Sequence, residues 1–441
     1  MRSQLSNAAY GVLDYAAYPI AMLVSAPTLL KHLGVAQYGI WIVTTAALNT
    51  GSIVASGFGD ANIQYISSAR SYGDSGVLLR SVRSMLGINL LLGAALAVLS
   101  WVLVPLAASH VAGSAAGLEA ACRLSLRIAS ALMLVRAIES VCVSTQRAFE
   151  RYGAAVRISL LARVITVAVA VLLSMRGFGV AAIMVATACL LVLSTAAQLI
   201  RLKQYLGASS LLPSFDRQAT TALFSIGAFS WLLAVSSVVF TQADRLLLGV
   251  SLGATTVTAY ALCVQMAQPV YGIAASGLHF LFPYLSARNA ISEPAAIRKA
   301  VLAAFAVNLL IVAVGAGLLL LFGPAALYAW VGRSVAQSAV SILPPIVFSF
   351  ALLGLSVTGY YSLLALGHIH TVTALNLFGG LAMLLLMAWL LQLQGVHGIA
   401  MARLCYGFIA LLMYVPLARV LGGARAPSLS PSDIRPVCED V

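Results

Sequence analysis

Long apolar runs separated by short polar segments make up nearly the whole chain. A membrane-spanning helix needs about 20 mostly apolar residues, and twelve runs of that kind can be distinguished. They cover residues 8–30, 39–68, 84–106, 118–146, 154–175, 178–200, 220–249, 255–287, 300–323, 336–365, 372–392 and 396–418. The first run is too long for the apolar core of a signal peptide, so we expect it to be a spanning helix. The pattern predicts an all-α polytopic membrane protein with 12 transmembrane helices.

The longest polar stretch lies halfway along the chain. It covers residues 201–219 and separates the twelve runs into two sets of six. We therefore predict an N-lobe at residues 1–200, a cytoplasmic linker at 201–219 and a C-lobe at 220–421. The last residues, 422–441, contain three prolines and few apolar side chains. They are predicted to form a disordered cytoplasmic tail.

The two halves share a weak internal similarity. A Leu-Gly pair, ending in Gly34 and in Gly253, separates the first two runs of each half. The second run of each half is long and contains residues that weaken a helix. The candidate hinge residues are Gly57, Gly59, Pro269 and Pro283. Transporters are often built from such repeats, with the substrate bound at the repeat interface.

The charge distribution supports this topology. Only 8% of the residues are charged, against roughly 25% in a soluble domain. If both termini are cytoplasmic, sixteen of the 25 Lys and Arg residues lie on the cytoplasmic side, three on the opposite side and six inside the runs. Such a bias is the positive-inside pattern of membrane proteins. Topology therefore explains most of the net charge of +13, and we expect a lipid bilayer and no nucleic acid as partner.

Motifs of hydrolytic or metal chemistry are missing from the sequence. There is no GxxxxGK[ST], HExxH or GxSxG segment. The six cysteines show no CxxC or CxxH spacing, so neither a metal site nor a disulfide framework is supported. We expect a protein that is not an enzyme and has no metal or cofactor.

Six arginines inside the apolar runs are the main candidates for a binding site. They are Arg123, Arg127, Arg136, Arg163, Arg245 and Arg403. A charged side chain at the bilayer centre costs about 2.5–3.5 kcal/mol on insertion scales, so such a group is usually paired or faces a polar cavity. A positively charged cavity would suit an anionic substrate, because a guanidinium binds phosphate oxygens with two hydrogen bonds.

Sequence spacing distinguishes arginines that are expected to form ion pairs from arginines that are expected to face the cavity. Ion pairs are expected between Glu119 and Arg123 and between Arg136 and Glu139, because residues three or four apart share a helix face. Asp244 and Arg245 are adjacent and diverge by about 100° around a helix, which makes them a poor pair. Arg127, Arg163 and Arg403 have no acidic partner in their own runs. Arg127 and Arg163 lie about 14 Å deep at 1.5 Å per residue, and we expect both to face the cavity.

Acidic and aromatic side chains in the runs suggest further roles. Gating or ion coupling is the hypothesis for four acidic residues: Asp14, Asp60, Glu139 and Asp244. Helix capping and ion pairing are the structural alternatives. Aromatic residues that could stack on sugars, or form an interfacial belt, are Tyr15, Tyr18, Trp41, Tyr65 and Trp231.

Several segments resemble Wzx-type polysaccharide flippases, which belong to the multidrug/oligosaccharidyl-lipid/polysaccharide exporter superfamily. They are residues 33–41 (LGVAQYGIW), 57–66 (GFGDANIQYI), 72–74 (YGD), 244–249 (DRLLLG) and 257–260 (VTAY). Gln64 and Thr258 depart from the family pattern. The resemblance implies two six-helix lobes around a central cavity in the bacterial inner membrane. It also implies a polyprenyl-pyrophosphate-linked oligosaccharide that moves from the cytoplasmic to the periplasmic leaflet by alternating access.

The resemblance places the expected function in the synthesis of O-antigen, capsule or exopolysaccharide. A polysaccharide polymerase and a chain-length regulator are then possible partners. The membrane potential is expected to help the outward movement of an anion, since one charge is worth about 2.3 kcal/mol per 100 mV, with or without coupling to H+ or Na+. The alternatives are a cation-coupled multidrug exporter with an acidic cavity, a membrane enzyme of glycan assembly, and a scaffold that does not transport.

Overall fold

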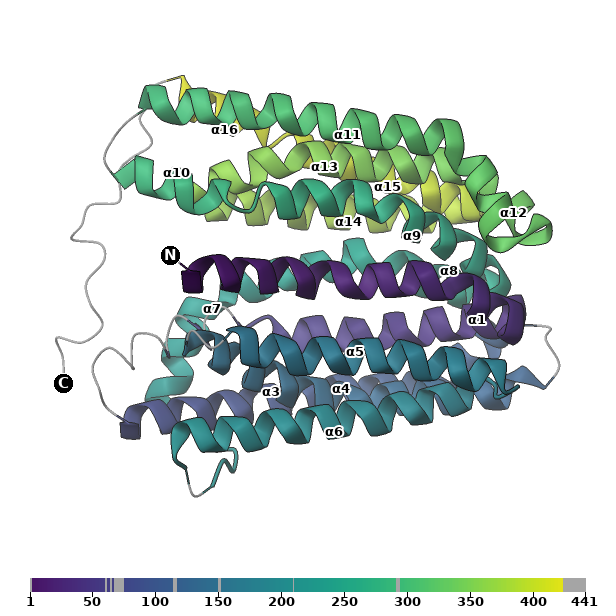
Figure 1. Ribbon diagram of the computed structural model, residues 1–441, viewed down its shortest axis with the longest axis horizontal. Helices are drawn as coiled ribbons and strands as arrows, with labels where there is room; N and C mark the ends of the chain where they lie inside the picture. The colour runs from purple at the N-terminus through teal and green to yellow at the C-terminus, as the bar shows by residue number, and fades with distance from the viewer. Residues whose placement is uncertain are drawn as a thin grey trace.

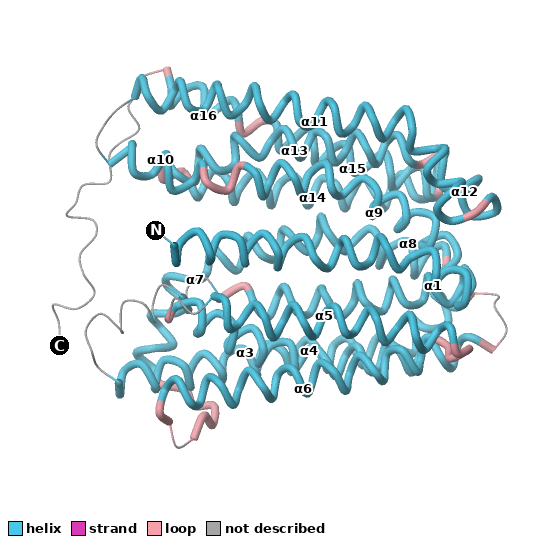
Figure 2. The backbone as a smooth tube through the Cα atoms, viewed as in Figure 1, coloured by secondary structure: helices cyan, strands magenta, loops and turns pink. Residues whose placement is uncertain are grey.

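The protein is a bundle of α-helices (Figures 1 and 2). The computed structural model describes residues 2–59, 62–63, 66, 75–113, 117–149, 152–208, 210–290 and 294–422. Every regular element in these residues is a helix, which confirms the predicted all-α class. The tail predicted at 422–441 lies outside the described residues beyond residue 422.

The helices follow the predicted runs in chain order. Their bounds are α1 Arg2–Ser56, α3 Ser75–Ala112, α4 Leu118–Ala148, α5 Tyr152–Met175, α6 Val180–Leu206, α7 Arg217–Val238, the π-helix η1 Val239–Ala243, α8 Asp244–Leu252, α9 Ala254–Gly277, α10 Leu281–Ala290, α11 Pro294–Val331, α12 Arg333–Val340, α13 Leu343–Ala365, α14 Ile369–Gln394, α15 Val396–Leu411 and α16 Tyr414–Leu421. Predicted runs seven, eight, ten and twelve each contain more than one helical element. They correspond to α7–η1–α8, α9–α10, α12–α13 and α15–α16.

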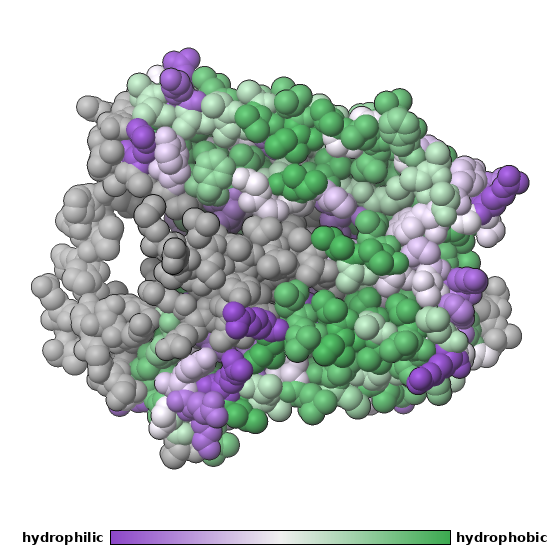
Figure 3. Space-filling model, viewed as in Figure 1, coloured by the Kyte–Doolittle hydropathy of each residue, from purple (hydrophilic) through white to green (hydrophobic). Residues whose placement is uncertain are grey.

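The lengths and the hydropathy of the helices are those of a multi-pass membrane protein. Within the described residues, nine helices are long and apolar enough to cross a membrane. One of these nine, Pro19–Val54, covers parts of both the first and the second predicted run. Figure 3 shows the hydrophobic residues over the middle of the bundle and most hydrophilic residues towards its two ends. The exact number of twelve spans stays a prediction.

Figure 1 shows helices α3–α6 gathered on one side of the bundle and α9–α16 on the other. Helix α1 begins, and α16 ends, at the same end of the bundle (Figure 1). The proposed N-lobe and C-lobe boundaries and the cytoplasmic side of the termini stay predictions.

Two glycines interrupt the first helix pair of each half in the same way. Gly34 has φ 78° and ψ 166°, and Gly253 has φ 80° and ψ 171°. Only glycine adopts this part of backbone space readily, because it has no Cβ. The weak internal similarity seen in the sequence therefore corresponds to a repeated backbone turn.

The two turns pack against each other at the end of the bundle opposite the start of α1 (Figure 1). The Thr258 hydroxyl on α9 donates to the Val35 carbonyl, which follows the first turn, at 2.8 Å. A Cβ at Gly39 would overlap the carbonyl oxygen of Ala254. Glycine at this position therefore lets the backbones of α1 and α9 lie in direct contact, and we call this contact the α1–α9 closure.

Helix α7 connects the two groups of helices. The linker before it binds α3, because the Ser214 amide donates to the Arg83 carbonyl at 3.1 Å. The Trp231 indole donates to the Val54 carbonyl at 3.0 Å and its ring stacks on Phe58. Further along, α7 continues through η1 into α8, which packs on α9.

The four candidate hinge residues differ in their surroundings. Gly57 lies in a turn directly after α1, and Gly59 follows it. Pro269 lies inside α9, which continues through it to Gly277. Pro283 lies in the first turn of α10, after the break that separates α9 from α10. Their action as hinges stays a prediction.

A methyl group at Gly39 should weaken the α1–α9 closure. We expect Gly39→Ala to destabilise the fold by about 1–3 kcal/mol, as overpacking does elsewhere, and to lower the temperature of thermal unfolding in detergent. Gly317→Ala on α11 is the matched control, because a Cβ there meets nothing within 4 Å. Equal unfolding temperatures for the two variants would contradict the closure described above.

Candidate functional site

A cavity of about 870 Å³ lies between α1, α7–η1–α8, α9, α10, α13, α14 and α15. It extends from Arg245 on α8 to His279 and Phe282, between the end of α9 and the beginning of α10. Polar side chains around it are Thr45, Asn49, Ser236, Thr241, Gln242, Gln265, Gln268, Ser356 and Asn376. Its aromatic side chains include Tyr271, Tyr360, Tyr361 and Tyr406.

The lining carries positive charge and no described carboxylate. Arg245 and Arg403 are its cationic residues, and no Asp or Glu of the described chain lines it. The neutral lining residues are amides, hydroxyls and phenols, which bind sugars and phosphates as well as water. The described wall of the cavity therefore favours an anionic or uncharged polar ligand over a cation.

Arg245 is the cationic side chain with unused hydrogen-bonding capacity. Its Nε is buried and has no hydrogen-bond partner, and no described acidic side chain forms an ion pair with it. Gln242 precedes it by three residues, is only 7% exposed, and its Oε1 also has no partner. Gln242 belongs to the π-helix η1, a distortion often found at functional sites. Both side chains line the cavity, although these two atoms themselves are enclosed by protein.

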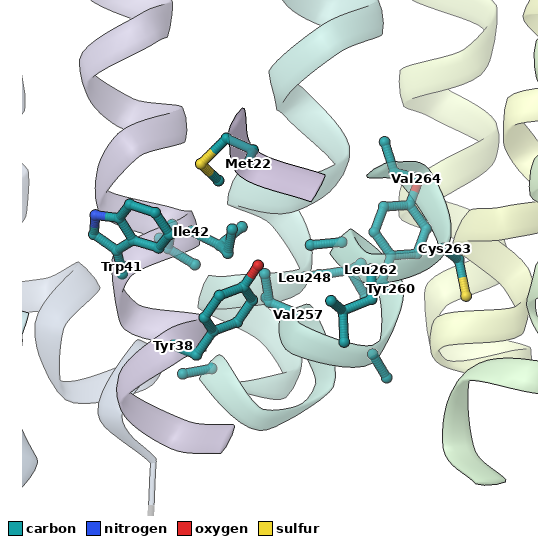
Figure 4. Packing of buried hydrophobic residues seen from close by; sticks show 14 of the residues in the cluster. Met22, Tyr38, Trp41, Ile42, Leu248, Val257, Tyr260, Leu262, Cys263 and Val264 are labelled. Atoms are coloured by element: carbon teal, nitrogen blue, oxygen red, sulfur yellow. The ribbon is translucent and has the colours of Figure 1, made fainter. Parts of the chain in front are cut away.

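Arg403 is held in a different way. Its guanidinium is 1% exposed and forms an ion pair with Asp244 through Nη1 and Oδ2. The Tyr260 hydroxyl donates to the same Asp244 oxygen at 2.7 Å. Figure 4 shows Tyr260 among the buried hydrophobic residues at the core of the bundle, close to Val264 and Leu262. This buried pair joins α8, α9 and α15, and loss of one partner from such a pair typically costs about 3–5 kcal/mol.

The structure corrects the position predicted for Arg127. Its side chain is exposed on α4, with the guanidinium 5.4 Å from the centre of the Trp101 ring on α3. Trp101 is itself 48% exposed, so this cation–π contact lies on the outside of the bundle. Arg127 is not one of the residues that line the cavity. The prediction was wrong because depth along a run gives height in the membrane and not direction.

The other arginines of the first half also lie outside the lining of this cavity. Arg163 is half-buried on α5 and is not one of the residues that line this cavity, so its role in binding stays a prediction. Arg123 pairs with Glu119, and Arg136 pairs with Glu139 at 2.7 Å, which confirms the two ion pairs predicted from spacing. The structure brings together Arg245, Arg403 and Asp244, and not the arginines of α4 and α5.

Of the acidic candidates Asp14, Asp60 and Asp244, the structure describes the side-chain contacts of Asp244. Asp244 was a candidate for cation binding, but its oxygens accept from Arg403, Tyr260 and the backbone amide of Arg245, so the described site is an ion pair. The side chain of Asp14 and the whole of Asp60 lie outside the described residues. No group of three or more His, Cys, Asp and Glu residues in the described chain could hold a metal ion.

Two of the five aromatic candidates have described side chains, and neither of them lines the cavity. Trp41 is 4% exposed and packs edge-to-face on Tyr38, and Trp231 stacks on Phe58. Tyr15, Tyr18 and Tyr65 have no described side chain. A signal in the sequence could have found the cavity wall: Gln265, Gln268 and Tyr271 recur at helical spacing along α9 and all line the cavity.

Comparison with protein families identifies the chain by sequence. Residues 29–327 match the family model described as "Polysaccharide biosynthesis protein". None of the curated proteins searched matches the chain.

Solved structures show the same fold. An inward closed conformation of the lipid II flippase MurJ has a TM-score of 0.75 at 14% identity and covers 92% of this chain and 87% of that one. An inward-facing multidrug resistance MATE family transporter of the MOP superfamily has a TM-score of 0.68 at 15% identity, with 93% and 94% covered. An outward-facing MATE family transporter has a TM-score of 0.54 at 14% identity, with 93% and 95% covered.

The positive charge of the cavity can be measured by cysteine chemistry. In a variant without its six native cysteines, Thr241→Cys should react faster with an anionic than with a cationic methanethiosulfonate of similar size. Thr241 is exposed, lines the cavity and precedes Arg245 by four residues. A unit charge contributes on the order of 1 kcal/mol to a neighbour in a partly aqueous site, so Arg245→Gln should lower the rate ratio at least threefold. Arg127→Gln should not change the ratio, and an equal fall in both backgrounds would contradict the placement of Arg245.

Proposed function

The chain belongs to the family of polysaccharide biosynthesis proteins, and from this premise we propose that it flips a lipid-linked oligosaccharide by alternating access. The substrate is an oligosaccharide repeat unit linked through pyrophosphate to a polyprenyl carrier. It moves from the cytoplasmic to the periplasmic leaflet of the bacterial inner membrane, for the synthesis of O-antigen, capsule or exopolysaccharide. A polymerase and a chain-length regulator would act on the product. The observation that carries the proposal is the cationic cavity, in which Arg245 forms no ion pair with a described acidic side chain and no described carboxylate lines the wall.

The proposed pyrophosphate site is the Arg245 end of the cavity. A guanidinium stays charged and can donate two parallel hydrogen bonds to phosphate oxygens. The amides of Gln242, Gln265 and Gln268 line the same cavity and can donate to phosphate or accept from sugar hydroxyls. The glycan would extend along the tyrosines towards His279, while the prenyl chain stays in lipid. A volume of about 870 Å³ is large enough for a polar head group of this kind.

The direction of opening agrees with uptake from the cytoplasmic side. The α1–α9 closure lies at the end of the bundle opposite the start of α1 (Figure 1), and the cavity extends away from it to His279 and Phe282. The positive-inside pattern would place the start of α1 in the cytoplasm. The structure is also more similar to an inward-facing than to an outward-facing MATE transporter, with TM-scores of 0.68 and 0.54. In the proposed cycle the closure opens after the substrate has bound.

A cation-coupled multidrug exporter is the alternative with the same fold. Its cavity would need acidic side chains to attract a cationic drug. The described lining has none, and Asp244 is neutralised by Arg403. The anionic substrate is therefore better supported.

Removal of the Arg245 guanidinium should abolish most export. Arg245→Ala deletes a charge-assisted contact worth about 1.5–3 kcal/mol, which corresponds to roughly 10–100-fold in affinity. In cells without the native gene, surface polymer should fall strongly with Arg245→Ala and partly recover with Arg245→Lys, at equal protein levels in the membrane. Arg127→Ala should support normal polymer levels. Normal export by Arg245→Ala would remove this residue from the proposed site.

The membrane potential should contribute to the cycle. An interior-negative potential favours outward movement of pyrophosphate and return of the empty, positively charged cavity, by about 2.3 kcal/mol per charge and 100 mV. In proteoliposomes, with the cytoplasmic ends of the transporter facing the lumen, flipping should therefore accelerate when a potential with a negative lumen is imposed. Separate imposed gradients of H+ and Na+ test ion coupling. Rates that do not respond to the potential would contradict this part of the proposal.

A further inference from the structure

Arg245, which forms no ion pair with a described acidic side chain, directly follows an acidic residue in the chain. Asp244 precedes it in the chain, is fully buried, and accepts a hydrogen bond from the Arg245 backbone amide at 2.7 Å through Oδ1. A negative carboxylate so close would cancel much of the field of the guanidinium, even without a direct contact, because charges interact strongly in a partly desolvated site. Something must therefore compensate Asp244 if Arg245 is to attract an anion.

We propose that Arg403 is a positioning residue that neutralises Asp244 and so keeps the charge of Arg245 available to an anionic substrate. This inference rests on the proposed function. It replaces the role predicted for Arg403 as a ligand of pyrophosphate. It also replaces the role predicted for Asp244 in ion coupling.

Both oxygens of Asp244 accept hydrogen bonds, and none of these bonds comes from the Arg245 side chain. Its Oδ2 accepts from Nη1 of Arg403 and from the Tyr260 hydroxyl, and its Oδ1 accepts from the backbone of Arg245. The carboxylate is thus directed towards α9 and α15. The adjacent Arg245 side chain points elsewhere on the helix, since neighbouring residues diverge by about 100°.

The guanidinium of Arg403 is fixed in turn. Its Nε donates to the Ser349 hydroxyl at 3.4 Å, and it lies 4.9 Å from the centre of the Phe350 ring, both on α13. It forms part of the cavity wall but is only 1% exposed. A cation so enclosed and already paired has little capacity for a second anion, whereas Arg245 is half-buried and forms no ion pair with a described acidic side chain.

The pair is therefore neutral as a unit, and the charge of the described site is that of Arg245. This arrangement makes a specific prediction about removal of its members. Loss of Arg403 alone leaves a buried carboxylate beside Arg245 and should weaken the binding of anions. Loss of both the Arg403 and the Asp244 charge should leave the attraction of anions by Arg245 unchanged. A residue that binds the substrate directly could not be rescued by a second substitution of this kind.

The test is a cycle of Arg403→Gln, Asp244→Asn and the double variant. Each variant is assayed for thermal unfolding, for binding of a polyprenyl pyrophosphate in nanodiscs, and for the anionic-to-cationic reagent ratio at Thr241→Cys. Arg403→Gln should lower affinity and ratio by at least about tenfold, the effect of one unpaired charge in such a site. Asp244→Asn should keep or raise both values, and the double variant should return to within about threefold of the parent protein.

A double variant that folds but remains as weak as Arg403→Gln would overturn the proposal and make Arg403 a direct ligand. Normal values for Arg403→Gln would also overturn it. If Arg403→Gln does not fold, Arg403→Lys takes its place. This variant keeps a positive charge beside the Asp244 carboxylate, so a low anionic-to-cationic reagent ratio in its folded form contradicts the proposal. If the parent protein binds no polyprenyl pyrophosphate, the proposed function fails, but the reagent ratio still tests the role of Arg403.

Discussion

The buried ion pair between Asp244 and Arg403 determines both the packing and the charge of the cavity. It joins helices α8 and α15, and Tyr260 and Ser349 add α9 and α13 to the same cluster. A buried pair of this kind adds little net stability over apolar packing, but it is costly to break. The pair also affects function, because it neutralises the negative charge of Asp244. Arg245 is then the cationic residue of the cavity lining that forms no ion pair with a described acidic side chain.

The segments that resemble flippases have a structural meaning in this fold. Residues 33–41 contain the glycine turn at Gly34, and residues 244–249 and 257–260 lie on either side of the turn at Gly253. Gly39 and Thr258, which pack at the α1–α9 closure, belong to these segments. So do Asp244, Arg245 and Tyr260. These segments therefore hold the halves of the bundle together at one end, directly beside the proposed anion site. Opening of that end and release of an anion would involve the same residues.

Much of the fold could be predicted from the sequence. Apolar runs, the glycine turns at Gly34 and Gly253, and the pairs at helical spacing depend on local physics, and the structure agrees with them. The binding site depends on tertiary contacts. Arg403 has its partner 159 residues away, and Arg127 is turned towards Trp101 on a neighbouring helix. An arginine without an acidic partner in its own helix can therefore be paired elsewhere or face outwards, and hydropathy does not distinguish the two.

The proposed transport mechanism requires the cavity to select an anionic lipid-linked head group through Arg245. The most direct measurement compares the binding of two synthetic lipids to the purified protein in nanodiscs. Both carry the same short glycan on the same polyprenyl chain, one through pyrophosphate and one through an uncharged linkage. The pyrophosphate lipid should bind at least about tenfold more tightly, and this preference should be lost at high ionic strength as screening increases. Equal affinities for the two lipids at low ionic strength would contradict it.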